Sequence, residues 1–311
     1  MVRATFWPYS RDPYDIYRIL LRNPRVSRGQ LTRIFKVNPK TVDIWWKAAL
    51  EKRIIIPPVF RRKSFLNFRE YYYFLNVEDP HELYESLQKT DLPITYFSVH
   101  TGFCNFQIIS KEPIDPPGNV ILSGPRSDYF VTIPPKCSFE EGVTKIEELL
   151  LNVNGIESKE SPLRYHDIPY EPWDEKDEVI FWEICNNVRI PFASIVRSAG
   201  TYNDKTWSWF RNRDTFGDTI TMFFPRGEGS YQLSLYSIKT DHDSILMDIF
   251  SHLPTSTLFY RLAGRVIMGV YVPFLPSKGA RFIVRKVLSS LQKKELVTEY
   301  TNSIVEYYYR L

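Results

Sequence analysis

The residues of this sequence that are best suited to chemistry are lysines and arginines that gather near its start. The stretch from Tyr14 to Lys63 has 13 Lys and Arg against 3 Asp and Glu, a net charge of +10, although all 311 residues together have a net charge of only +4. A helical unit with this excess of positive charge is typical of proteins that bind a phosphate backbone. The alternative is a solvated surface on which charges cluster by chance.

A pattern of three helices predicts how this basic stretch folds. Apolar residues recur at helical spacing over residues 14–23. Ser27 and Gln30 form a capping-box pattern at the start of a second helix. Asn38 and Pro39 are typical of the cap and the first residue of a third helix. Three helices in this order predict a helix-turn-helix unit.

The third helix is expected to present two chemically different faces. Val42 and Trp46 repeat at helical spacing and predict the side that packs on the core, whereas Trp45 fits either side. Polar side chains on the early turns of such a helix can reach base edges. The candidates for base contact are Lys40, Thr41, Asp43, Ile44 and Lys47. The candidates for phosphate contact, which would position the protein without reading sequence, are Arg28, Arg33, Arg61, Arg62 and Lys63.

An internal duplication determines the organisation of the chain. Residues 180–214 repeat the plan of residues 16–50 at a constant offset of 164, so that Arg25 corresponds to Arg189. Each of these stretches is followed by a similar succession of strands and helices. A repeat of this size predicts two copies of one structural plan.

The second copy lacks the positive charge of the first. From Asp177 to Arg226 there are 6 Lys and Arg against 6 Asp and Glu, a net charge of zero. The run Lys205-Thr206 matches Lys40-Thr41 of the first copy only if the offset grows from 164 to 165. The third helix of the second copy can therefore be aligned with that of the first in two ways. We expect a weaker or lost DNA role for this copy, which would then pack against the rest of the molecule. Its candidate contacts are Lys205, Thr206, Arg211 and Arg213.

The segments after the two helix-turn-helix units predict a second domain type. Their order of strand, helix, strand, strand and helix suggests a ferredoxin-like α/β sandwich, and we expect the two sandwiches to pack through their sheets. The predicted fold class is therefore α+β, with two winged helix-turn-helix domains and two ferredoxin-like domains. The predicted boundaries are 1–63 and 177–226 for the former, 64–154 and 227–311 for the latter, and 155–176 for a linker.

Two local predictions concern where elements begin and end. We expect Pro57 and Pro58 to break a short strand at residues 54–56, because proline cannot donate to a strand ladder. We also expect a long helix from Lys278 to Lys294, ahead of the last strand.

Two motifs give the chain a resemblance to a known family. Residues 37–42, VNPKTV, followed by Ile54, resemble the recognition helix and strand start of the Lrp/AsnC (feast/famine) transcription regulators. Residues 101–106, TGFCNF, resemble the glycine-centred hairpin of that family. The chain is similar to two fused copies of such a regulator over nearly its whole length. It departs from the family after the hairpin glycine, where Asn105 and Ile267 replace the usual acidic residue.

The resemblance implies a prokaryotic, cytoplasmic transcription regulator. Its main partner would be double-stranded DNA, recognised chiefly through the first helix-turn-helix. A small-molecule effector and a homodimer are further partners that the resemblance implies. An effector site would lie near the hairpin glycines, at His100, Thr101, Gly102, Asn105 and Gly264.

The sequence contains no catalytic signature, so we expect no enzymatic activity, no cofactor and no metal. There is no Gly-rich phosphate loop, and the five histidines show no ligand spacing. His100 leaves two interpretations open, a cross-strand or pocket-lining residue and a residue that acts on a bound ligand. Siroheme decarboxylases resemble the same two-domain plan, so the alternative function is a ligand-binding protein or enzyme of that kind without DNA binding. A protein-interaction adaptor is a third hypothesis.

Bulk properties exclude some locations. No run of 18 apolar residues is present, so we expect no membrane partner. The first residues lack the apolar core of a signal peptide. The three cysteines, Cys104, Cys137 and Cys185, are scattered, which argues against a disulfide framework and favours the cytoplasm.

Overall fold

The computed structural model describes residues 13–89, 93–152, 155–170, 173–274 and 282–310. The chain has an α+β fold with antiparallel sheets, as predicted, and divides into two compact units. Within the described ranges, no helix has the length and apolar character needed to cross a bilayer. A helical unit comprises Met1–Arg61, Asp174–Asp214 and Thr219–Ser230, and a sheet unit comprises Arg62–Trp173, Thr215–Asp218 and Tyr231–Leu311.

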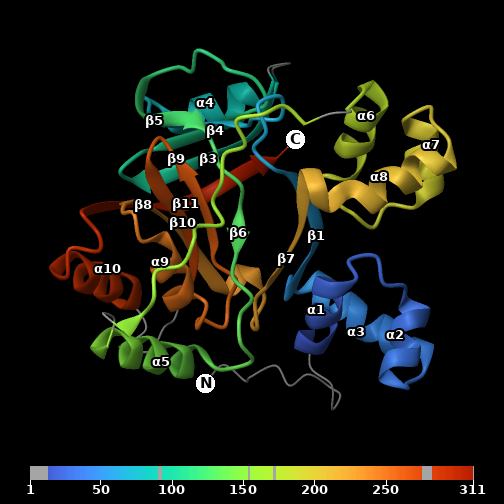
Figure 1. Ribbon diagram of the computed structural model, residues 1–311, viewed down its shortest axis with the longest axis horizontal. Coiled ribbons are helices and arrows are strands. Elements are labelled where there is room, and N and C mark those ends of the chain that lie inside the picture. The colour runs from blue at the N-terminus through green and yellow to red at the C-terminus, as the bar shows by residue number, and fades with distance from the viewer. Residues whose placement is uncertain (1–12, 90–92, 153–154, 171–172, 275–281, 311) are drawn as a thin grey trace. The chain divides into compact units, whose positions relative to one another are not determined.

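The helical unit contains both helix-turn-helix copies (Figure 1). Ser27 and Gln30 form the predicted capping box, and the Asn38 side chain accepts a hydrogen bond from the backbone N–H of Lys40. The first copy consists of α1 (Pro13–Arg22), α2 (Arg28–Phe35) and α3 (Pro39–Glu51), and the second of α6 (Glu175–Ile184), α7 (Phe192–Ser198) and α8 (Asn203–Phe216).

A strand follows each copy, and the two strands pair with each other. These are β1 (Ile55–Arg62) and β7 (Gly217–Phe223), which form a two-stranded sheet. The prediction that Pro57 and Pro58 end the first strand is wrong. Both strands of a two-stranded sheet are edge strands, where the nitrogen of a proline can face away from the partner strand and needs no hydrogen. The carbonyl of Pro58 accepts a hydrogen bond from the N–H of Val188 in the second copy, and the strand continues through both prolines.

Each of these strands also completes the core of the opposite copy. Phe60 on β1 is fully buried and packs its ring against Phe181 and Trp209 of the second copy. Phe223 on β7 packs against Tyr14 and Tyr17 of the first copy. The two helix-turn-helix cores are therefore built from both copies, and neither is complete within its own segment.

Two corresponding arginines add a reciprocal contact between the copies. Arg25 donates hydrogen bonds to the carbonyls of Val188 and, at 2.8 Å, Ile190. Its counterpart Arg189 donates to the carbonyl of Val26 at 2.7 Å and to that of Pro24, 2.8 Å away. Burial, followed by repulsion from Arg25, lowers the pKa of Arg189 to about 10. Because the offset of 164 relates both donors and both pairs of acceptors, the two copies are arranged as in a two-fold symmetric dimer.

The sheet unit is built around one nine-stranded sheet, in the order β5-β2-β4-β3-β11-β8-β10-β9-β6. The first half supplies β2 (Tyr71–Asn76), α4 (Pro80–Leu87), β3 (Ile94–Gly102), β4 (Phe106–Ser110), β5 (Asn119–Pro125), β6 (Phe130–Val131) and α5 (Phe139–Leu151). The second half supplies β8 (Tyr231–Lys239), α9 (Asp243–Phe250), β9 (Leu258–Leu262), β10 (Arg265–Pro273), α10 (Ile283–Lys293) and β11 (Glu299–Arg310). The predicted helix start at Lys278 lies outside the described residues.

Two quartets within this sheet have the ferredoxin-like strand order. These are β5-β2-β4-β3 and β11-β8-β10-β9. When the strands of a quartet are counted along the chain, the fourth lies beside the first and the third beside the second. In the first quartet β5 precedes α5 along the chain, and α5 packs against α9 and α10 (Figure 1). β11 joins the quartets by pairing with β3 on one side and β8 on the other.

One core of the sheet unit contains residues from both quartets, as expected for sandwiches that pack through their sheets. It joins Tyr72 and Phe74 of β2 to Leu235, Tyr260 and Ile267 of the second quartet. A separate core lies between the first quartet and α4. Residues 155–170 of the expected linker, 155–176, belong to this unit, and the ring of His166 stacks there on Phe65.

Candidate nucleic-acid interface

The outer face of α3 is the surface that the sequence predicts to contact base edges. Trp45 is buried with Val42 and Trp46, which decides between its two interpretations in favour of the core. The exposed residues on the opposite side include Lys40, Ile44 and Lys47. The helix thus has the two chemically different faces that were predicted.

Cationic side chains on this surface are available to a partner. Lys40 and Lys47 are exposed, as is Arg33 on α2, and none of the three has an ion-pair partner among the described residues. Thr41 is half-buried. Arg28 and Asp43 are both about half exposed and form an ion pair with each other at 3.0 Å. Asp43 therefore holds α3 against α2 through an exposed contact that solvent weakens.

The predicted phosphate cluster at residues 61–63 needs correction. Arg61 donates to the carbonyls of Phe60 and Cys185, the latter at 2.6 Å. Arg62 is only 8% exposed, and its guanidinium lies 4.9 Å from the centroid of the Phe68 ring. Lys63 lies 3.9 Å from a carboxylate oxygen of Asp218. These three side chains contact other groups of the protein and are therefore removed from the candidate phosphate contacts.

The structure decides the register of the second copy. Thr206 is as fully buried as Val42, and Trp209 and Phe210 are as buried as Trp45 and Trp46. The offset of 164 therefore holds throughout α8. Lys205 corresponds to Thr41 rather than to Lys40, and the buried Thr206 is removed from the candidate contacts.

The other basic candidates of the second copy are partly neutralised. Lys205 forms ion pairs with Asp174 at 2.9 Å and Asp177 at 2.8 Å. The Lys205 ammonium holds the pKa of Asp174 at about 2. Arg213 donates to the carbonyl of Phe210 at 2.7 Å, which leaves Arg211 as the exposed candidate.

One contact between the second and third helices has changed its chemistry between the copies. Arg28 and Asp43 correspond to Phe192 and Trp207 at the same offset. Where the first copy has an ion pair, the second has two rings whose centroids are 4.4 Å apart. The outer face of α8 further has Asp204, Ser208 and Arg211 in the places of Lys40, Ile44 and Lys47.

The predicted effector residues of the first hairpin serve the sheet itself. His100 is buried, with its ring nitrogens 2.7 Å from the Ser98 hydroxyl and 3.1 Å from that of Ser303, and burial lowers its pKa to about 4. A Cβ on Gly102 would lie 2.3 Å from the Asn302 carbonyl oxygen, so β11 needs glycine there. This close approach places β11 where we had predicted an effector.

Of the remaining predicted effector residues, Thr101 and Asn105 form hydrogen bonds within the protein, and Gly264 lies in a turn that faces open space. Thr101 donates to Glu306. The Asn105 amide donates to the Val77 carbonyl at 2.7 Å, and its oxygen accepts from the Val77 N–H at 2.9 Å. Gly264 lies in the turn between β9 and β10, with a φ of 75° and open space around it. The structure therefore does not gather the five residues around one ligand position.

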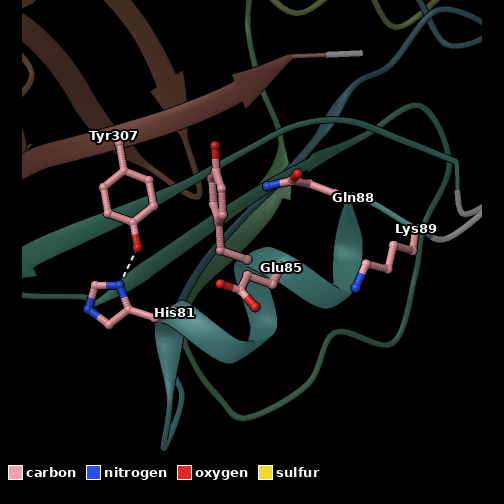
Figure 2. A pocket seen from close by; sticks show the side chains of 6 residues that line it. His81, Glu85, Gln88, Lys89 and Tyr307 are labelled. Atoms are coloured by element: carbon pink, nitrogen blue, oxygen red, sulfur yellow. Dashed lines mark hydrogen bonds between the residues drawn. The ribbon is translucent and has the colours of Figure 1, made fainter.

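A hollow that the sequence did not suggest lies between α4 and β11. Its volume is about 500 Å³, and its lining residues are His81, Tyr84, Glu85, Gln88, Lys89 and Tyr307. Figure 2 shows the side chains of α4 beside Tyr307, whose hydroxyl is hydrogen-bonded to Nδ1 of His81. The spacing of the α4 residues could have indicated a shared helix face, but only the structure adds β11. Within the described ranges no cluster of His, Cys, Asp and Glu could hold a metal ion.

Two solved structures are similar to this chain, both of the siroheme decarboxylase NirDL, one of them in complex with an iron-uroporphyrin III analogue. Both are 9% identical to this chain, and the similarity covers 96% of it and 92% of the other chain, with TM-scores of 0.49 and 0.48. No family model matches the sequence, and no curated protein matches it. Both structures are of an enzyme, whereas the sequence led us to expect no enzymatic activity for this chain, and that expectation is withdrawn.

Proposed function

We propose that this protein binds double-stranded DNA through the outer face of α3 and acts in the regulation of transcription. The observation that carries the proposal is the pair Lys40 and Lys47, exposed on α3 and without an ion-pair partner among the described residues. They lie about two turns apart, on the side of the helix opposite Val42, Trp45 and Trp46. A helix that buries one face and offers cations and an exposed Ile44 on the other can enter a major groove.

The charge around α3 supports the same proposal. Several further basic side chains of the first copy are exposed and have no ion-pair partner within the described ranges. They are Arg18, Arg22, Arg33, Lys36 and Lys52. Cations on the neighbouring helices would neutralise phosphates on either side of the groove, which supplies affinity, while α3 supplies base contacts.

The decisive experiment is a titration of a labelled duplex at low salt, followed by fluorescence anisotropy. We expect the Lys40→Ala/Lys47→Ala variant to bind at least about tenfold more weakly, since one base contact contributes about 1–3 kcal/mol. The slope of log affinity against log salt should fall by about 0.9 for each of the two lysines that contacts a phosphate. Circular dichroism would establish that the exposed substitutions leave the fold intact.

The second copy provides the matched control. Asp204 and Arg211 correspond to Lys40 and Lys47. The Asp204→Ala/Arg211→Ala variant removes one charge of each sign, so the net charge of α8 does not change and duplex binding should stay within about twofold of the unaltered protein. Undetectable duplex binding at low salt would overturn the proposal. Equal losses in the two double variants would overturn the assignment to α3.

A further inference from the structure

The second copy has an aromatic surface where the first has charge. Trp207 is 52% exposed and Tyr202 is 61% exposed, although both belong to a folded helix-turn-helix. One side of the Trp207 indole faces Phe192, with the ring planes at 40° to each other. The guanidinium of Arg25 lies 4.3 Å from the centroid of the same Phe192 ring. Phe192 is therefore in contact with a cation and with an exposed indole.

Buried contacts hold the rings of Phe192 and Trp207 in place. Arg25 is fixed by its hydrogen bonds to the carbonyls of Val188 and Ile190. Phe192 also meets the edge of the buried Phe210 ring, with centroids 4.9 Å apart. An exposed ring on a fixed support loses little side-chain entropy when another flat group stacks on it. Trp207 is thus prepared for a planar ligand.

Two exposed arginines of the second copy favour a ligand with negative charge. Arg211 lies one turn after Trp207 on the same face of α8, and Arg197 lies in the last turn of α7. Both are exposed and have no ion-pair partner among the described residues. The acids on this face are Asp204, at the start of α8, and Asp214, which forms an ion pair with Arg213 at 3.3 Å, so an anionic chain would pass on the side of Arg211. Aromatic rings beside arginines are the combination that binds unpaired bases and their phosphates.

We infer that the outer face of α8 binds single-stranded nucleic acid. One base stacks on Trp207 and another on Tyr202, while Arg197 and Arg211 contact the backbone phosphates. The site is separate from α3 and does not depend on duplex binding there. The first copy cannot provide the same site, because Asp43 and Asn38 occupy the places of Trp207 and Tyr202.

Anisotropy with a labelled single strand of about 16 nucleotides, the upper site size of small binding domains, tests this inference. We expect Trp207→Ala to weaken single-strand binding by about tenfold, the usual effect of losing one stacked base. Trp207→Phe keeps a ring and should restore most of the affinity. Trp182→Ala is the matched control, since Trp182 is 37% exposed on α6 of the same unit, and should change the affinity by less than twofold. Tyr202→Ala provides a second, independent variant, with an expected loss of severalfold.

Variants in the two copies distinguish single-strand binding by α8 from duplex binding by α3. Loss of single-strand binding in Trp207→Ala with unchanged duplex binding supports the inference. Undetectable single-strand binding by the unaltered protein overturns it, and so does single-strand binding that Lys40→Ala/Lys47→Ala abolishes but Trp207→Ala does not. Failure of duplex binding alone would leave the α8 site in place and refute only the role of α3.

Discussion

Val42 in the first helix-turn-helix and Thr206 in the second are both fully buried, whereas two residues before them an exposed lysine, Lys40, corresponds to an exposed aspartate, Asp204. Along both helices, positions that face the core keep their burial, whereas the outward positions change in part: Ile44 becomes Ser208, and Lys47 stays a cation as Arg211. The contacts between the copies are preserved as well, since Arg25 and Arg189 make the same hydrogen bonds in reverse.

The difference shows that the interior and the outer faces of the two copies are under different constraints. The interior of each copy is shared, because β1 completes the core of the second copy and β7 that of the first. A change in one core therefore affects both, which limits how far either interior can diverge. The outer faces have no such coupling, so their chemistry can follow two different partners.

The largest expected effect tests whether the cores are shared. Phe60→Ala removes a fully buried ring that the first copy places against Phe181 and Trp209 of the second. We expect the free energy of unfolding to fall by about 3–5 kcal/mol in a denaturant titration. Val59→Ala, at the half-buried neighbouring position, should cost clearly less. A loss below about 1 kcal/mol for Phe60→Ala would mean that the second copy has a core of its own.

The next effect concerns the hairpins of the sheet unit, which differ in the same way. His100 of the first hairpin corresponds to Leu262 of the second, two residues before Gly102 and Gly264 respectively, and both side chains are buried. Burial lowers the pKa of His100 from 6.5 to about 4. Between these values the unfolded chain binds a proton that the folded chain excludes, so stability falls as the pH drops from about 6.5 towards 4.

The expected loss over that pH range is up to about 3 kcal/mol, from 1.36 kcal/mol for each unit of difference. His100→Leu, which copies the second hairpin, should remove this part of the pH dependence of unfolding. The exposed His81 serves as the control site, and His81→Leu should leave the acid-dependent loss in place. An unchanged pH profile in His100→Leu would show that another group causes it.

A charge exchange on α8 should give a smaller effect in the opposite direction. Asp204→Lys places on the second copy the charge that Lys40 gives the first. We expect duplex affinity at low salt to rise by severalfold and the salt slope to increase by about 0.9. The reverse exchange, Lys40→Asp, should lower both. If Asp204→Lys has no effect on either quantity, α8 does not approach duplex DNA.

The sequence predicted the features that depend on neighbouring residues. The caps at Ser27 and Asn38 are local, and the helices begin where those residues predict. β1 was predicted too short because its continuation through Pro58 depends on Val188, which is 130 positions away. β5 was missed because it pairs with β2 across two intervening strands of the chain.

In the candidate site too, the features that depend on neighbouring residues were predicted, and those that depend on distant residues were not. Exposure of Lys40 and Lys47 follows from helical spacing and was within reach of the sequence. The burial of Arg62 depends on Phe68 in the sheet unit and was not. The aromatic pair could have been found, because the offset of 164 relates Arg28 and Asp43 to Phe192 and Trp207. When two such positions change together from opposite charges to two rings, they are expected to be in contact.

The smallest expected effect distinguishes those two contacts energetically. Arg28→Ala breaks an ion pair whose side chains are about half exposed, so the free energy of unfolding should change by less than about 1 kcal/mol. Phe192→Ala removes a ring that packs on both Trp207 and Phe210 and should cost more, since an aromatic pair contributes about 0.5–1.5 kcal/mol beyond the area it buries. Raising the salt concentration should reduce the effect of Arg28→Ala and leave that of Phe192→Ala unchanged. Equal costs in both variants, or a salt dependence in Phe192→Ala, would mean that the aromatic contact is no better built than the ionic one, and Trp207 would then lack the fixed support on which a base could stack.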